Sequence, residues 1–118
     1  MPWYNESSMI LIIRKKATQE EMNKMAEDLD GYIKVVVDVE LGILAGGGKR
    51  HFDAEQVLLE EGSAQEDLWG GGYDLEIKQI DYNSMINVRP RQNNHSRDIM
   101  SSEIRTEFDV IVKKLLLL

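Results

Sequence analysis

The segment His51–Leu59 contains the residues of this chain that are best suited to chemistry. In an extended strand, His51, Asp53 and Glu55 would all point to one face, with next-but-one neighbours about 7 Å apart. An imidazole and two carboxylates are suitable ligands for zinc, manganese or iron, and a bound ion would activate water or hold a phosphate. The spacing therefore predicts a divalent-metal site or an acid–base pair.

The same segment can also be interpreted as the solvated side of a sheet, with its carboxylates in structural ion pairs. One feature favours the interpretation that this face is the wall of a pocket. In a strand, Val57 and Leu59 would point to the same face as the three polar residues, and both prefer burial. A β-bulge near Gln56 would turn Val57 and Leu59 to the opposite face and remove this argument. Both interpretations stay open on the sequence alone.

Basic residues gather in a second segment, Arg89–Arg97. Pro90 favours an extended backbone before it, so Arg89 and Arg91 are expected to project to one side and to hold a carboxylate or phosphate. Trp69 is a candidate to stack on such a ligand, or alternatively a lid over the edge of the core. The alternative role of the arginines is to neutralise carboxylates of the chain itself. The candidate ligand-binding residues are Arg89, Arg91, His95 and Trp69, with Arg97 beside them, and the candidate carboxylate partners are Asp38, Asp53, Glu55, Glu66 and Asp67.

Two glycine triplets resemble phosphate-binding loops, in the stretches AGGGK (45–49) and WGGGYD (69–74). Neither has the spacing of a P-loop. The first triplet precedes an expected strand, whereas phosphate-binding loops usually lead into a helix. Tight turns are therefore the expected role of both triplets.

Hydrophobic periodicity predicts the elements that must position these residues in the first half of the chain. A short apolar strand at Met9–Ile13 is followed by a helix, for which Thr18 and Glu21 form a capping box. Alternation with period two predicts a strand from Tyr32, and a hairpin turn is expected near Glu40–Gly42.

The second half is expected to hold three further strands and a final helix. We expect a long loop at Glu61–Gly72, with one helical turn near Ala64–Leu68, and Ser101 as the N-cap of the last helix. The terminal leucines exceed what one helix face needs and are candidates to cover a partner subunit. The strands are expected at His51–Leu59, Leu75–Ile80 and Met85–Val88, and the helix stripe comprises Ile104, Phe108, Ile111 and Leu115.

The order of these elements, β-α-β-β-β-β-β-α, lacks regular alternation and predicts an α+β fold. We expect a single domain over residues 9–118, with a largely antiparallel sheet of five to six strands. An N-terminal and a C-terminal helix should pack on one face of that sheet. Residues 1–8 are expected to be a polar N-terminal extension, and the length of 118 residues suits one hydrophobic core.

Three stretches together resemble a family of small prokaryotic proteins that is catalogued as a domain of unknown function. They are YIKVVVDVELGILAGGG (32–48), HFDAEQVLLEEGSAQEDLWG (51–70) and INVRPRQNNHSRDI (86–99). The resemblance extends over about Met9 to Leu117. It implies a single-domain cytoplasmic protein, and it brings no activity, cofactor or site residue with it.

Composition excludes several classes of function. The formal net charge of −7 argues against general nucleic-acid binding, because phosphate backbones are bound through clustered lysine and arginine. The absence of cysteine excludes a disulfide framework and a thiolate zinc site. No apolar run approaches the roughly 20 residues of a membrane span, and the first residues lack the order of a signal peptide, so a cytoplasmic location is expected.

The sequence thus supports two hypotheses from different classes. The first is a binding or assembly module without chemistry of its own, which forms a homo-oligomer. The alternative is a metal-assisted hydrolase or a phosphate-ligand enzyme, in which His51, Asp53 and Glu55 hold a divalent metal ion and Arg89 and Arg91 hold a small anion. The enzyme hypothesis requires the two clusters to face one cavity.

Overall fold

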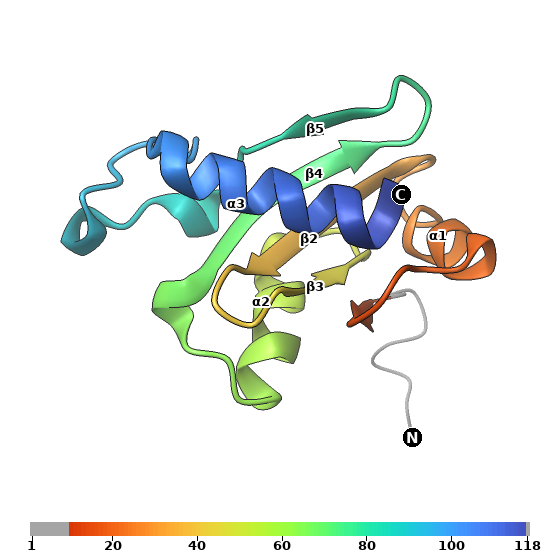
Figure 1. Cartoon of the computed structure of the whole chain (residues 1–118), viewed down its shortest axis with the longest axis horizontal. Coiled ribbons are helices and arrows are strands. Elements are labelled where there is room, and N and C mark those ends of the chain that lie inside the picture. The colour runs from red at the N-terminus through yellow and green to blue at the C-terminus, as the bar shows by residue number, and fades with distance from the viewer. Residues whose placement is uncertain (1–9, 118) are drawn as a thin grey trace.

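The computed structural model describes residues 10–117 and has an open antiparallel sheet in the strand order β1-β3-β2-β4-β5 (Figure 1). The predicted α+β class and the single domain are confirmed. Within residues 10–117, no helix is long and apolar enough to cross a membrane. The strands are β1 (Leu11–Ile13), β2 (Tyr32–Asp38), β3 (Ile43–Gly46), β4 (Leu68–Asp74) and β5 (Gln79–Asp81), and the helices are α1 (Gln19–Met25), α2 (His51–Glu60) and α3 (Ser102–Val112).

The hairpin between β2 and β3 forms where the sequence predicts it. Val37 pairs with Leu44 across the two strands, and Gly42 takes a positive φ of 70° in the turn. The buried carboxylate of Asp38 accepts the backbone N–H groups of Glu40 and Leu41, each at 2.9 Å. A side-chain acceptor at the end of β2 therefore stabilises the turn.

One side of the sheet, which we call the α3 face, carries the larger core. Ile33, Val35 and Val37 of β2 point to this side, where they pack with residues of α1 and α3. Helix α3 runs across this face, and α1 lies near one end of it (Figure 1). Both helix starts are capped as predicted, by Thr18 with Glu21 and by Ser101. The helical core residues include Met22, Met25, Phe108, Val112, Leu115 and Leu116.

The opposite side, which we call the α2 face, is covered by a helix where a strand was expected. Ala54 and Leu58 of α2 pack on Val36, Ala45 and Leu68 of the sheet. The predicted N-terminal and C-terminal helices both pack on the α3 face, and the strand predicted at His51–Leu59 is wrong, because this segment is a helix that covers the other face. The buried positions of α2 are 51, 54, 55 and 58, which is a helical period, and two of them are the polar residues His51 and Glu55.

Strand β4 also replaces a predicted loop. Residues Leu68–Asp74 pair with β2 along their whole length, so WGGGYD is the middle of a central strand and not a turn. A short 3₁₀ turn precedes it at Gln65–Asp67, close to the predicted helical turn. The strand predicted at Leu75–Ile80 is replaced by the short strand β5. The strand predicted at Met85–Val88 is replaced by a 3₁₀ turn at Met85–Asn87.

The terminal leucines belong to the protein's own core. Leu115 and Leu116 lie in a π-helical turn after α3 and are 1% and 4% exposed. They pack with the α3-face residues, so they are not a surplus that a partner must cover. Leu118 lies outside the described residues, as do residues 1–9, which include the predicted N-terminal extension at residues 1–8. The prediction of a homo-oligomer thus loses the observation that motivated it.

Candidate functional site

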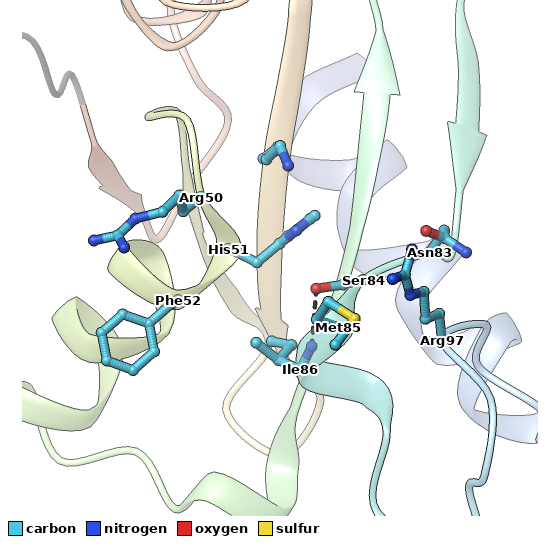
Figure 2. Close-up of a pocket in the computed structure, with 9 residues that line it drawn as sticks. Arg50, His51, Phe52, Asn83, Ser84, Met85, Ile86 and Arg97 are labelled. Atoms are coloured by element: carbon cyan, nitrogen blue, oxygen red, sulfur yellow. Dashed lines mark hydrogen bonds between the residues drawn. The ribbon is translucent and has the colours of Figure 1, made fainter.

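A cavity of about 360 Å³ lies on the α2 face, beside the first turn of α2. Arg50, His51 and Phe52 line it on one side, and the segment 83–86 with Arg97 lines it on the other (Figure 2). Three of its nine lining residues are positively charged and none is acidic, although the whole chain carries a net charge of −7. The lining residues are Lys34, Arg50, His51, Phe52, Asn83, Ser84, Met85, Ile86 and Arg97.

The glycines of β4 allow the walls of this cavity to approach the sheet. Gly70 and Gly72 pair with Val36 and Lys34 of β2, so their missing side chains would point to the α2 face. A Cβ atom at Gly70 would lie 2.7 Å from Cβ of Ser84, and one at Gly72 would lie 1.8 Å from the hydroxyl oxygen of Tyr32. The triplet therefore serves close packing, as glycine in a strand often does.

His51 occupies the first position of α2 and is buried against β4. Its Nε2 lies 2.6 Å from the carbonyl oxygen of Gly71, and because a carbonyl only accepts, Nε2 carries the proton and donates it. Burial lowers the pKa of His51, and the charge of Lys34 acts in the same direction, while the Gly71 bond and Asp81 oppose them. The imidazole is therefore a fixed neutral donor at neutral pH.

The chain reaches α2 through the first glycine triplet, and this reverses an argument from the sequence. Gly47 and Gly48 have φ angles of +108° and +78° and form the turn predicted for them, after which Arg50 occupies the N-cap position of α2 without a capping hydrogen bond from its side chain. The order is strand, glycine loop and helix, the order that suits anion binding at a helix N-terminus. The objection that AGGGK precedes a strand is wrong, because His51 begins a helix.

Two buried asparagines hold the other wall of the cavity. The side chain of Asn87 accepts from the N–H of Gly70 at 2.8 Å and donates to the carbonyl oxygens of Gly70, Tyr82 and Arg97. Asn94 binds the backbone of residues 87, 96, 98 and 100 in the same manner. The segment 82–100 is thus fixed by side-chain bonds to backbone, and Arg97 is held beside β4.

The cations of the cavity differ in their partners. Arg50 forms an ion pair with Asp53, with Nη2 and Oδ1 2.8 Å apart. Within residues 10–117, neither Lys34 nor Arg97 forms an ion pair with a carboxylate. The nearby Asp81 accepts a hydrogen bond from the hydroxyl of Tyr32 at 2.6 Å, and this bond together with burial raises the pKa of Tyr32. Two cations of the cavity are therefore available to a ligand.

The three residues of the predicted metal site do not converge. On a helix, Asp53 points away from His51 and Glu55, and its carboxylate is held by Arg50. Glu55 is 3% exposed and accepts from Nε2 of Gln65 at 3.3 Å. Over residues 10–117, no group of three histidine or acidic side chains is arranged to hold a metal ion. The strand geometry that motivated a metal site is wrong.

The predicted arginine cluster is also divided. Arg89 is half-buried, stacks on Trp69 with its guanidinium carbon 4.3 Å from the ring centroid, and donates to the carbonyl oxygens of Leu68, Gln65 and Ile86. Burial lowers its pKa, and the charge of Glu55 opposes this shift. Trp69 is 2% exposed, so it belongs to the core. Arg91 and His95 are exposed outside the cavity, and Arg97 is the member that lines it.

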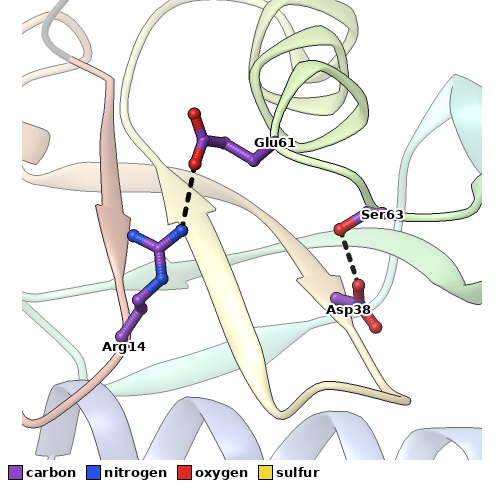
Figure 3. Close-up of polar contacts among 4 residues, drawn as sticks. All are labelled: Arg14, Asp38, Glu61 and Ser63. Atoms are coloured by element: carbon purple, nitrogen blue, oxygen red, sulfur yellow. Dashed lines mark hydrogen bonds and ion pairs between the residues drawn. The ribbon is translucent and has the colours of Figure 1, made fainter.

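Two polar contacts fix the end of α2 that lies away from the cavity (Figure 3). Arg14, just after β1, forms an ion pair with Glu61 at 3.2 Å. Ser63 donates to the second carboxylate oxygen of Asp38 at 2.6 Å. The exposed ion pair contributes little, whereas the buried carboxylate of Asp38 accepts hydrogen bonds on both oxygens and joins β2 to the segment after α2.

Comparison with models of protein families identifies the family of this chain. A family model matches residues 11–115, which is nearly the whole chain, and its description reads "Protein of unknown function (DUF5674)". The chain belongs to this family. The match confirms the resemblance seen in the sequence, and the family description names no activity. Neither a curated protein nor a solved structure is significantly similar to the chain.

Three residues of the site, Lys34, Asn87 and Asn94, have no direct signal in the sequence. Lys34 is one polar residue in an alternating strand, and its place in the cavity follows from the pairing of β2 with β4. The asparagines lie in a polar stretch with the composition of a loop, and their burial shows only in three dimensions. What the arrangement offers chemically is a set of fixed positive charges and N–H donors around a small hollow.

Proposed function

We propose that this protein is a binding module for a small oxyanion-bearing ligand, which enters the cavity between α2 and the segment 83–97. The observation that carries the proposal is the basic lining without a carboxylate, in a chain of net charge −7. A phosphate or carboxylate group suits Lys34 and Arg97, which have no ion pair within residues 10–117. The N–H groups of the first turn of α2 favour the same charge.

The proposal is for binding and not for catalysis. It keeps the first of the two hypotheses from the sequence and replaces the residues expected to hold the anion. Arg97 and Lys34 take the role proposed for Arg89 and Arg91, because Arg89 is committed to backbone carbonyls. Self-association stays a prediction that nothing in this proposal requires.

Titration with inorganic phosphate, followed in ¹H–¹⁵N NMR spectra, tests the proposal. We expect the amides of residues 51, 52 and 84–86 to shift, and Lys34→Gln and Arg97→Gln each to weaken binding by about tenfold, since each removes a charged hydrogen-bond donor.

Arg91→Gln is the matched control, because it removes one positive charge from the neighbouring exposed segment outside the cavity. It should change the affinity by less than about twofold. Equal weakening by all three substitutions would show nonspecific attraction. Shifts that avoid the cavity would exclude the site.

A further inference from the structure

We infer that the ligand is an organic phosphate with an apolar ring close to its phosphate group, bound with the phosphate inward and the ring at the mouth of the cavity. This inference rests on the proposed anion binding and names the class of anion. It is carried by two exposed apolar side chains, Phe52 and Met85, that line the same cavity as the cations.

The size of the cavity requires more than an inorganic ion. A volume of about 360 Å³ corresponds to about a dozen water molecules at roughly 30 Å³ each. A single phosphate group would fill only a small part of it. Pockets that bind organic ligands begin at about this size, and their linings combine apolar surface with a few polar groups.

The apolar residues stand at the entrance on different elements. Phe52, in the first turn of α2, is 52% exposed, and Met85, in the turn after β5, is 63% exposed. Figure 2 shows them on either side of His51. An aromatic ring and a flexible thioether are well suited to contact a flat apolar group between them.

The polar groups of the cavity lie at different depths below the surface. His51 is buried and Lys34 is half-buried on the sheet, whereas Arg50 and Arg97 are exposed. Arg50 also lies over the ring of Phe52, with its guanidinium carbon 5.8 Å from the centroid. A phosphate that reaches Lys34 would therefore leave its organic substituent beside Phe52 and Met85.

Titration calorimetry with phenyl phosphate and methyl phosphate tests the inference, because the two probes carry the same charged group and differ in the ring. We expect phenyl phosphate to bind the wild-type protein at least about tenfold more tightly. Phe52→Ala and Met85→Ala should each reduce this preference severalfold, because they weaken the binding of phenyl phosphate more than that of methyl phosphate.

Leu41→Ala is the control for loss of an exposed apolar side chain, since Leu41 is 60% exposed in the β2–β3 turn. It should not change either affinity. If both probes bind the wild-type protein equally, or if Phe52→Ala and Met85→Ala keep the preference, the inference is overturned while anion binding stands. If neither probe nor inorganic phosphate binds, the proposed function itself fails.

Discussion

The two faces of the sheet are built in opposite ways. On the α3 face, Ile33, Val35 and Val37 present a continuous apolar surface, and α1, α3 and the terminal leucines cover it. On the α2 face, the glycines of β4 present no side chains, and α2 covers only the half around Val36, Ala45 and Leu68. The uncovered half holds the basic cavity. The first face stabilises the protein, and the second leaves room for a ligand.

The largest expected effect compares an aromatic residue from each face. Phe108→Ala empties the centre of the α3-face core and should reduce the free energy of unfolding by about 4 kcal/mol. Phe52→Ala, at the mouth of the cavity, should change it by less than about 0.5 kcal/mol. Urea denaturation of the two variants measures both values. Similar losses would show that the α2 face is also a packed core.

A pair of glycine substitutions sharpens the comparison within β4. A Cβ at Gly71 would lie 2.2 Å from the backbone oxygen of Asp81 and 2.7 Å from Phe108, so Gly71→Ala should cost about 3 kcal/mol. A Cβ at Gly72 meets the end of the Tyr32 side chain, which can rotate away. Gly72→Ala should therefore cost less, about 1–2 kcal/mol. Thermal denaturation ranks the two variants, and the reverse order would contradict this account.

The wall of the cavity depends on Asn87. Asn87→Ala leaves the N–H and C=O of Gly70 without their side-chain partner, so we expect a loss of about 2 kcal/mol in stability. Because Asn87 also holds the backbone of Arg97, phosphate affinity should fall as well. Arg91→Gln is again the control, since Arg91 is exposed in the same segment outside the cavity. An Asn87 variant with full stability and full affinity would exclude this role.

The smallest expected effect is a dependence of stability on pH that His51 contributes. Its pKa is lower in the folded protein than the usual value of about 6.5, so the unfolded chain binds the proton more readily. The contribution of His51 is complete above about pH 6.5 and is lost as the pH falls below that value towards the folded pKa. The facing charges are Lys34, Arg50 and Arg97, with Asp81 of opposite sign.

His51→Gln removes this contribution while leaving a side-chain donor for Gly71. The difference in unfolding free energy between wild type and variant, measured by urea denaturation at several pH values, should shrink as the solution becomes more acid. A constant difference for His51→Gln would contradict burial as the cause.

Elements with strong local signals could be predicted from the sequence. The capping box of α1, the alternation of β2, the turn at Gly42 and the Ser101 cap depend on residues within a few positions of one another. The candidate site could be predicted only in part. His51 and Arg97 were found by residue type, but His51 was assigned to the wrong element and Arg97 was not separated from Arg89 and Arg91.

The sequence by itself determined the α+β class, the single domain and the starts of α1, β2 and α3, because capping, periodicity and turn chemistry act over short distances. Only the tertiary structure decided that WGGGYD is a central strand. Glycine has little tendency to form strands. It is tolerated in β4 because other segments of the same chain lie so close to the strand that a side chain would clash with them. Tertiary packing also decided that His51–Glu60 is a helix, in which the polar residues His51 and Glu55 are buried. Both effects shape the cavity, because the first turn of α2 lines one side of it and Ser84, which packs against Gly70, lines the other.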